Sequence, residues 1–316
     1  MNFKNRITAS LRGIAPALAV LSIASAPQLA RAELTTPVLT INDDAADPHI
    51  TVQALRDNIS VVMGSGGNIT VLAGAKGRLL VDAGIASSRP KLEPALNGIS
   101  AAPIKYLINT HYHWDHTDGN PWVHDLGATI IAHENTLKRV TSGTRVIEWG
   151  YTFKPLPAGG LPTVTFKTEK TMDFEGESIS IRHVGTGHTD TDAIVYFKQA
   201  DVLAVGDIWW NGHYPFIDYD AGGGINGLIK EVDACIGAST DRTIIVPGHG
   251  EVSNRAKLVR FRDMLVAIRD NVARLKKQGK TVAEAVAARP TAAFDAEYGT
   301  FLIDPAFFTL LVYTGV

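Results

Sequence analysis

Four side chains able to bind metal lie close together in the segment 111–116, which reads His-Tyr-His-Trp-Asp-His. They are His111, His113, Asp115 and His116. The segment follows an apolar run at 104–109 that is typical of a buried strand. A loop held at the end of a strand can turn several imidazoles towards one point, which a helix cannot do for residues two apart. Neutral imidazole and carboxylate groups bind Zn²⁺ and neighbouring divalent metals, so the segment predicts a metal site.

Three more candidate ligands follow later apolar runs, each in a turn that contains glycine. They are His188 in Val-Gly-Thr-Gly-His, Asp207 in Leu-Ala-Val-Gly-Asp and His249 in Val-Pro-Gly-His-Gly. Any one of these turns alone is a weak signal. Three in one chain, added to the segment 111–116, form a strong signal for a shared metal centre.

The rest of the chain supplies the elements that must position these ligands. β-Branched or apolar runs predict strands at 59–63, 69–72, 79–81, 104–109, 128–132, 163–166, 178–184, 193–197, 202–205 and 243–246. Helices are predicted at 89–96, 134–140, 225–236 and 253–278, the last from apolar residues that recur at three and four positions. The C-terminal run 301–312 is interpreted as a docking helix or core element. Strands followed by helices, twice over, predict a layered sandwich with helices on both outer faces.

The chain resembles the metallo-β-lactamase superfamily. The resemblance rests on His-x-His-x-Asp-His at 111–116, then Gly187-His188, Gly206-Asp207 and Pro247-Gly-His249-Gly in the family's order, and it spans roughly residues 59–250. It implies a four-layer αββα sandwich of the α+β class, with two metal ions at one edge between the sheets. It assigns His111, His113 and His188 to the first metal, Asp115, His116 and His249 to the second, and Asp207 to both.

Details of the motifs separate branches of the superfamily. The second motif position is His113, where iron-binding relatives carry Glu, and this favours two Zn²⁺ ions per chain. One group of true β-lactamases has Cys at the position of Asp207 and, three residues later, a Lys that holds the β-lactam carboxylate. That later position is Trp210 in this chain. Hydrolysis of β-lactams is therefore compatible with the sequence but is not implied by it.

The resemblance predicts a zinc hydrolase that cleaves an ester, lactone, thioester or amide, a β-lactam included. A hydroxide held between the two metals would attack the carbonyl carbon. Asp115 is the candidate catalytic residue, because it would hold the second metal and also orient the nucleophile or pass on a proton. Two alternatives stay open: a phosphodiester or sulfate ester hydrolase on the same fold, and a metal-binding protein without turnover. The formal net charge is −2, and no basic surface for nucleic acid is evident, so a small-molecule substrate is expected.

Other residues have supporting roles in this interpretation. Trp114, Trp209, Trp210 and His213 are candidates for the substrate pocket, although the cluster after Asp207 could equally pack against the helical layer. Asp82 closes a strand in Leu-Val-Asp-Ala-Gly and is expected to support a metal-bound histidine. Cys235 is the only cysteine, and its position on an apolar helix face favours packing over metal binding.

The N-terminus has the pattern of a secretory signal peptide. Basic residues in the first twelve positions precede a mostly apolar stretch at 14–25, and Ala30-Arg31-Ala32 offers small residues to a signal peptidase. We expect cleavage after Ala32, which leaves one hydrolase domain at 33–316 in the periplasm or outside the cell. No stable membrane anchor would remain after cleavage, and the sequence does not indicate an oligomeric state.

Overall fold

The computed structural model describes residues 36–316, and the expected signal peptide lies outside the described residues. A seven-stranded sheet has the order β1-β2-β3-β4-β5-β6-β9. Its strands are Thr51–Ala54 (β1), Ile59–Met63 (β2), Ile69–Gly74 (β3), Gly77–Val81 (β4), Ile104–Ile108 (β5), Thr129–His133 (β6) and Val164–Phe166 (β9). β1 to β4 are antiparallel neighbours, whereas β4, β5, β6 and β9 run parallel to one another.

A six-stranded sheet has the order β10-β11-β12-β13-β14-β15. Its strands are Glu169–Phe174 (β10), Glu177–His183 (β11), Ala193–Phe197 (β12), Val202–Ala204 (β13), Ile244–Val246 (β14) and Ser253–Asn254 (β15). Only β13 and β14 pair in parallel within this sheet. A separate hairpin joins Thr144–Val146 (β7) to Tyr151–Phe153 (β8).

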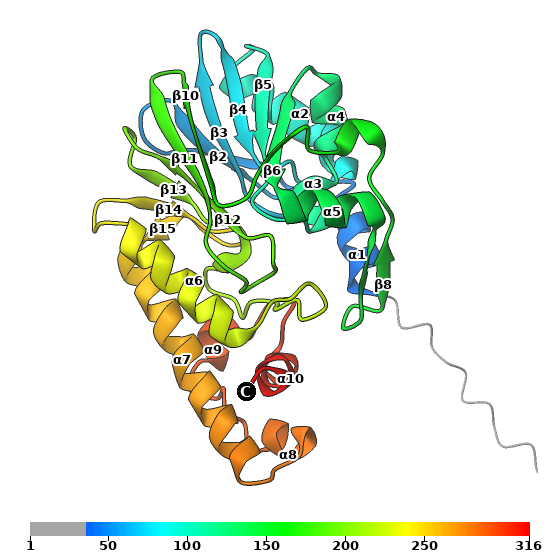
Figure 1. Cartoon of the computed structure of the whole chain (residues 1–316), viewed down its shortest axis with the longest axis vertical. Helices are drawn as coiled ribbons and strands as arrows, with labels where there is room; N and C mark the ends of the chain where they lie inside the picture. The colour runs from blue at the N-terminus through cyan, green and yellow to red at the C-terminus, as the bar shows by residue number, and fades with distance from the viewer. Residues whose placement is uncertain (1–35) are drawn as a thin grey trace, which may run out of the picture. The chain divides into compact units, whose positions relative to one another are not determined.

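Helices cover the outer faces of both sheets (Figure 1). They are Pro37–Asp44 (α1), Arg89–Ile99 (α2), Trp114–Thr117 (α3), Asn120–Asp125 (α4), Glu134–Ser142 (α5), Ile225–Ala238 (α6), Arg255–Lys277 (α7), Val282–Ala287 (α8), Asp295–Tyr298 (α9) and Pro305–Thr314 (α10). Among the residues that the structure describes, each helix is too short or too polar to cross a lipid bilayer.

Three hydrophobic clusters separate the four layers, because successive side chains of a strand point to opposite faces. On β2, Val61 joins the cluster between the two sheets, and Val62 joins the cluster beneath α2. On β12, Val195 faces the space between the sheets, whereas Ile194 packs towards α6 and α7 with Leu228. The expected αββα sandwich is confirmed by this layering.

Long amphipathic segments were predicted well, and polar edge strands were not. The helix expected at 253–278 is α7, and Cys235 is fully buried on α6 as expected. The run at 301–312 contributes α10, which buries Phe308 and Leu311. Two strands were not predicted: β1, whose four side chains are all exposed, and β10, which lies at a sheet edge and buries none of its side chains fully. Without a buried apolar face, such strands lack the pattern on which the prediction depends.

Candidate metal centre

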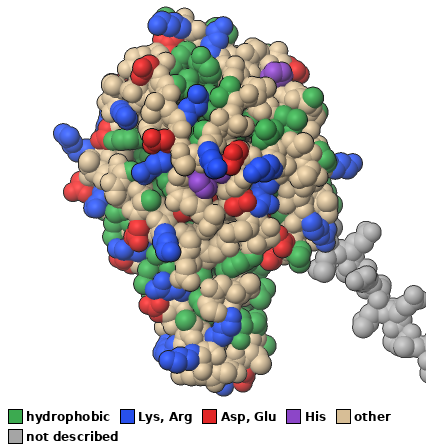
Figure 2. All heavy atoms as spheres, in the orientation of Figure 1, with side chains coloured by type: hydrophobic (Ala, Val, Ile, Leu, Met, Phe, Trp, Pro, Cys, Tyr) green, Lys and Arg blue, Asp and Glu red, His purple; other side chains and the backbone are tan. Residues whose placement is uncertain are grey.

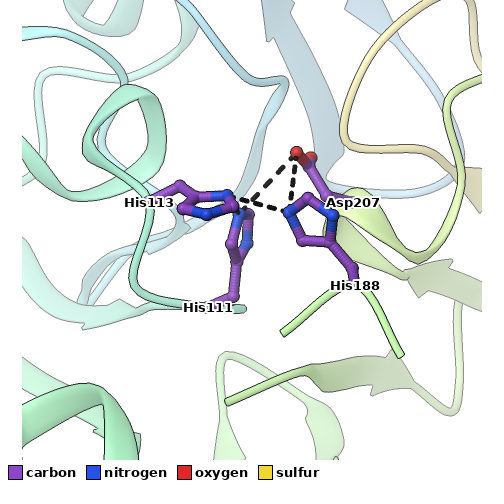
Figure 3. Close-up of side chains that lie close together, drawn as sticks. All are labelled: His111, His113, His188 and Asp207. Atoms are coloured by element: carbon purple, nitrogen blue, oxygen red, sulfur yellow. Dashed lines mark hydrogen bonds and ion pairs between the residues drawn. The ribbon is translucent and has the colours of Figure 1, made fainter. Parts of the chain in front are cut away.

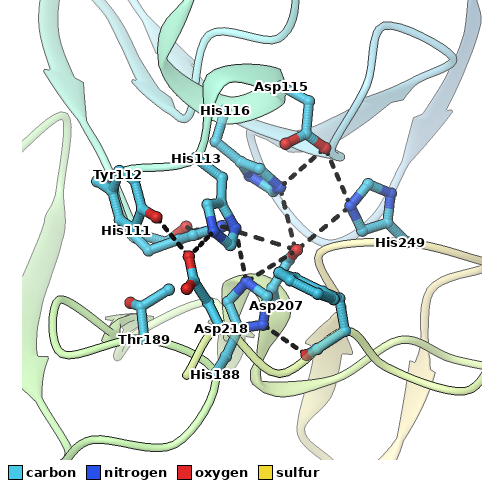
Figure 4. Close-up of polar contacts among 12 residues, drawn as sticks. His111, Tyr112, His113, Asp115, His116, His188, Thr189, Asp207, Asp218 and His249 are labelled. Atoms are coloured by element: carbon cyan, nitrogen blue, oxygen red, sulfur yellow. Dashed lines mark hydrogen bonds and ion pairs between the residues drawn. The ribbon is translucent and has the colours of Figure 1, made fainter. Parts of the chain in front are cut away.

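The seven candidate ligands meet where strands of both sheets end (Figure 4). The segment 111–116 follows β5, and its last part is a helical turn, α3, where an irregular loop was expected. His188 follows β11, Asp207 lies in a 3-10 turn after β13, and His249 follows β14. Because β13 and β14 are parallel neighbours, their carboxyl ends bring the last two ligands to the same edge.

One group consists of His111, His113, His188 and Asp207 (Figure 3). His113 Nδ1 lies 3.1 Å from His111 Nε2 and 2.8 Å from His188 Nε2. Asp207 Oδ2 lies 3.7 Å from His111 Nε2 and 3.4 Å from His188 Nε2. Tetrahedral zinc with bonds of about 2.0–2.1 Å separates its ligand atoms by roughly 3.3 Å, so these four atoms have the spacing of a zinc site.

A second group consists of Asp115, His116 and His249, and Asp207 lies beside it. Asp115 Oδ2 is 3.2 Å from His249 Nε2 and 3.5 Å from His116 Nε2. Asp207 Oδ1 is 3.0 Å from His116 Nε2, and its Oδ2 is 3.4 Å from His249 Nε2. The Asp207 carboxylate therefore contacts histidines of both groups, as the resemblance implied.

Three histidines use the ring nitrogen that points away from the centre as a donor, so in the neutral ring that a metal requires the inner nitrogen carries the lone pair. Thr110 donates its hydroxyl hydrogen to Asp82, so its oxygen accepts from His111 Nδ1 at 3.0 Å. His116 Nδ1 donates to Asp82 Oδ2 at 2.9 Å, and His188 Nδ1 donates to the Phe216 carbonyl at 2.9 Å. The nitrogens left facing the centre repel one another unless a cation lies between them.

Buried polar atoms without a hydrogen-bond partner are a second indication that the residues fit metal ions. His116 Nε2, His249 Nε2 and Asp207 Oδ1 are buried and have no hydrogen-bond partner among the described residues. A buried polar group left without a partner costs about 1–3 kcal/mol, and more when it is charged. Metal coordination would satisfy all three atoms, so both groups could hold metal ions.

The carboxylates and histidines of the centre shift one another's pKa. Burial alone would raise the pKa of Asp207, but the surrounding histidines hold it well below its usual range. Burial alone would lower the pKa of His249, but Asp207 and Asp115 raise it to about 9. Without metal, His249 is therefore protonated at neutral pH, and binding of a divalent ion must release that proton.

Asp82 occupies the supporting position expected from the sequence. Its carboxylate accepts from His116, from the Thr110 hydroxyl at 2.7 Å and from the Thr110 backbone at 2.8 Å. One carboxylate thus orients a histidine of the second group directly and, through Thr110, His111 of the first group. Such outer hydrogen bonds fix the tautomer and the direction of a metal-bound ring.

Asp218 has the same role for His113 and was not predicted. Its Oδ2 accepts from His113 Nε2 at 2.9 Å and from the Tyr112 hydroxyl, and its Oδ1 accepts from the Ala221 backbone at 2.9 Å. Burial alone would raise the pKa of Asp218, but the hydrogen bond from His113 contributes to lowering it below its usual value. The residue lies in the irregular stretch between η3 (Gly206–Ile208) and α6, where no motif marks it.

Two glycines allow the close approach of backbone to ligands. A Cβ atom on Gly67 would lie 2.0 Å from His116 Cε1, and one on Gly248 would lie 1.9 Å from Asp207 Oδ1. Neither contact is tolerable, so any larger residue at these positions must displace a ligand.

A cavity of about 920 Å³ opens in front of the centre, and Trp114 and Trp210 are among its lining residues, as are Asp115 and His249. Trp209 was also expected there, but it is fully buried and packs near Phe261 in the helical layer. His213 falls outside the lining as well, because its ring lies against Phe301. The structure thus corrects the expectation for Trp209 and His213. The sequence also gave no indication that α1 lines the cavity.

A family model described as the metallo-beta-lactamase superfamily matches residues 62–249, more than half of the chain. The chain belongs to the metallo-β-lactamase superfamily. The match includes all seven candidate ligands. The described residues supply two side-chain groups that could hold metal ions within this matched segment.

Named relatives show the same likeness. The metallo-beta-lactamase type 2 of Bacillus cereus is 26% identical over 159 residues, which cover 50% of this chain and 57% of that protein. The protein of the same name from Bacillus sp. (strain 170) is 25% identical over 159 residues, 50% of this chain and 56% of its own length. The chain thus spans little more than half the length of these curated relatives.

Solved structures share the fold at lower identity. A metallo-beta-lactamase from Pontibacter korlensis has a TM-score of 0.56 and 18% identity, covering 69% of this chain and 99% of that one. The stereoselective inverting sec-alkylsulfatase Pisa1 from Pseudomonas sp. has a TM-score of 0.63 and 16% identity, covering 84% of this chain and 50% of that one.

Proposed function

We propose that the protein is a zinc hydrolase with two Zn²⁺ ions, which cleaves an ester, lactone, thioester or amide of a small molecule. One observation carries the proposal: buried, unpartnered ligand atoms of two groups meet around Asp207 at the inner end of a cavity. Such a pair of divalent ions supplies Lewis acidity and makes hydroxide available at neutral pH.

The residues of the centre divide into those that reach the cavity and those that do not. His113, Asp115, Asp207 and His249 line the cavity, whereas the other three ligands lie behind them. A substrate carbonyl entering the cavity would therefore meet the face formed by these four side chains. Asp115 is well placed to orient the attacking oxygen or to hold its proton, because its carboxylate lies between His116 and His249 at the cavity edge.

The proposal extends to partner and location. On the face drawn in Figure 2, acidic and basic side chains are interspersed, which supports a small-molecule substrate over nucleic acid. The pattern at residues 1–32 supports export to the periplasm or the medium with no stable membrane anchor. Fractionation of cells that express the full chain, followed by N-terminal sequencing of the exported form, tests this part; a start at Glu33 is expected.

A turnover screen of the zinc-loaded protein tests the reaction. The substrates are 4-nitrophenyl butyrate, an acyl-homoserine lactone, a thioester, nitrocefin, bis-nitrophenyl phosphate and 4-nitrophenyl sulfate. We expect hydrolysis among the four substrates that carry a carbonyl group: the butyrate ester, the lactone, the thioester and nitrocefin. This activity should be lost in His116→Ala. The matched control is His124→Ala, because His124 belongs to neither ligand group and, among the described residues, its side chain hydrogen-bonds only to the Ala128 carbonyl. Turnover confined to the phosphate or sulfate ester would refute the proposed substrate class.

A further inference from the structure

The cavity in front of the metal centre is walled mainly by apolar and aromatic side chains. Three segments outside the centre supply them: α1 with Ile41, the β7–β8 hairpin with Trp149 and Phe153, and the stretch before α10 with Phe301 and Leu302. Trp149 and Phe153 also contact Trp114, at centroid distances of 5.3 and 4.9 Å. A cavity of this size and lining encloses a substrate with a bulky apolar group.

Two of these walls come from outside the segment matched by the family model. That segment is 62–249, whereas α1 spans Pro37–Asp44 and the last wall includes Phe301 and Leu302. α1 is held in place by hydrogen bonds: Trp114 Nε1 donates to Asn42 Oδ1 at 2.9 Å, and Ser88 donates to the carbonyl of Ala45 at 2.9 Å. The chain's own terminal segments therefore shape the space beside the shared metal centre.

Apart from the metal centre at its inner end, the charged side chains that line the cavity are acidic. Among residues 36–316, no Lys or Arg lines it. Asp43, Asp44 and Asp47 lie at its mouth and are exposed, and only Asp47 makes an ion pair with a described residue, Lys91, at 2.8 Å. An anionic group held at the mouth, away from the metal centre, would lose water without gaining a Lys or Arg partner, and it would face these carboxylates.

We propose, on the basis of the hydrolase function above, that the substrate carries a bulky apolar group and has no anionic group on the part that lies at the mouth. A cationic group is accepted at the mouth, where Asp43 and Asp44 face it. With an ester as substrate, the oxygen of water bonds to the acyl carbon and the acyl C–O bond breaks. The electron pair leaves on the alcohol oxygen, which takes up the proton, so the products are a carboxylic acid and an alcohol.

Three butyrate esters of matched shape test the charge preference. Their alcohols are choline, 3,3-dimethylbutanol and 2-hydroxyethanesulfonate, so the terminal group is cationic, neutral or anionic. At low ionic strength we expect kcat/KM to be at least about tenfold higher for the choline and dimethylbutanol esters than for the sulfonate ester. The reason is that the carboxylates of the mouth repel the sulfonate, and little salt is present to screen this repulsion. Equal or faster hydrolysis of the sulfonate ester would overturn the inference while leaving the hydrolase function intact.

Variants isolate the contribution of the mouth. In Asp43→Asn/Asp44→Asn we expect the cation-to-anion ratio of kcat/KM to fall by about three- to tenfold, since each exposed charge contributes modestly. The matched control Asp57→Asn/Asp241→Asn makes the same change in net charge at residues that do not line the cavity, and it should leave the ratio unchanged. An equal fall in both variants would show that net charge, and not the mouth, sets the preference.

A binding measurement keeps the inference separate from turnover. Hexyltrimethylammonium, hexanol and hexanesulfonate bound to the metal-free protein are followed by tryptophan fluorescence, because Trp114, Trp149 and Trp210 line the cavity. The expected order of affinity is the ammonium first, the alcohol next and the sulfonate last. If no ester is hydrolysed but this order holds, the proposed function fails and the charge preference of the cavity stands. If the sulfonate binds as tightly as the ammonium ion, the inference fails whatever the activity.

Discussion

Replacing Asp218 by Asn should weaken metal binding by the group that contains His113. Asp218 Oδ2 accepts two hydrogen bonds, from His113 Nε2 and the Tyr112 hydroxyl, while Oδ1 accepts from the Ala221 backbone. An Asn amide has the same size but only one acceptor oxygen. If that oxygen faces His113, the amide NH₂ meets the Ala221 N–H; if it is turned round, the NH₂ meets His113 and Tyr112. Either orientation sets donor against donor.

The magnitude follows from the kind of bond that is lost. A hydrogen bond to a charged group contributes about 1.5–3 kcal/mol, and 1.4 kcal/mol corresponds to tenfold in an equilibrium constant. Loss of a partner that orients a metal-bound histidine lowers metal affinity by roughly 10–100-fold. We therefore expect Asp218→Asn to weaken zinc binding to the His111, His113 and His188 group by that factor. Tyr112→Phe removes one donor and keeps the carboxylate, so its effect should be smaller.

Competition with a chromophoric chelator, fitted for stepwise zinc binding, measures the affinities. Asp82→Asn is the matched comparison, because Asp82 contacts His116 directly and should mainly weaken the group that contains Asp115, His116 and His249. Circular dichroism confirms that each variant is folded. Wild-type affinity for both zinc ions in a folded Asp218→Asn protein would refute the reasoning.

Three further predictions follow from contacts around the centre. Gly67→Ala should reduce zinc content to about one ion per chain by displacing His116, because the added Cβ would lie 2.0 Å from its ring; metal analysis showing full occupancy would contradict this. Glu231 is buried, and burial and then Asp192 raise the pKa of Glu231 well above its usual value. The carboxyl group of Glu231 therefore loses its proton at a lower pH in the unfolded chain than in the folded one. The free energy of unfolding should fall as the pH rises from the unfolded pKa near 4.5 towards the folded pKa, by up to about 1.4 kcal/mol per pH unit. Glu231→Gln should flatten that decline in unfolding free energy, measured by urea titration from pH 5 to 8; an unchanged slope would show that Glu231 does not cause it. Dialysis against EDTA should lower the unfolding temperature, and added zinc should restore it. A ligand present at a thousand times its Kd stabilises the folded state by about 4 kcal/mol. Calorimetry measures the unfolding temperature, and identical transitions before and after dialysis would exclude a metal bound to the folded state.

Much of the metal centre could be predicted because its ligands are marked locally. His188, Asp207 and His249 each follow an apolar run that became β11, β13 or β14, and parallel pairing brings the ends of β13 and β14 together. Asp82 was accessible to the same reasoning, because it too closes a strand. Asp218 was not, since only the tertiary fold brings its loop against His113.

The cavity walls were harder to predict than the ligands. Trp209 and Trp210 are neighbours in extended backbone, so one faces the helical layer and the other the cavity, and the sequence does not say which. The α1 helix carries one fully buried residue, Val38, and gives little periodic signal. The residues that line the cavity are brought there by such tertiary contacts, whereas the candidate metal ligands are marked in the sequence by their positions at strand ends.

Anomalous diffraction from crystals of the zinc-loaded protein tests the central claim most directly. The account predicts two peaks at the zinc edge, one among His111, His113 and His188 and one among Asp115, His116 and His249, with Asp207 between them. Protein from the same preparation should hydrolyse an apolar ester and lose that activity with EDTA. A single peak, or none, in a preparation with full and EDTA-resistant activity would contradict it.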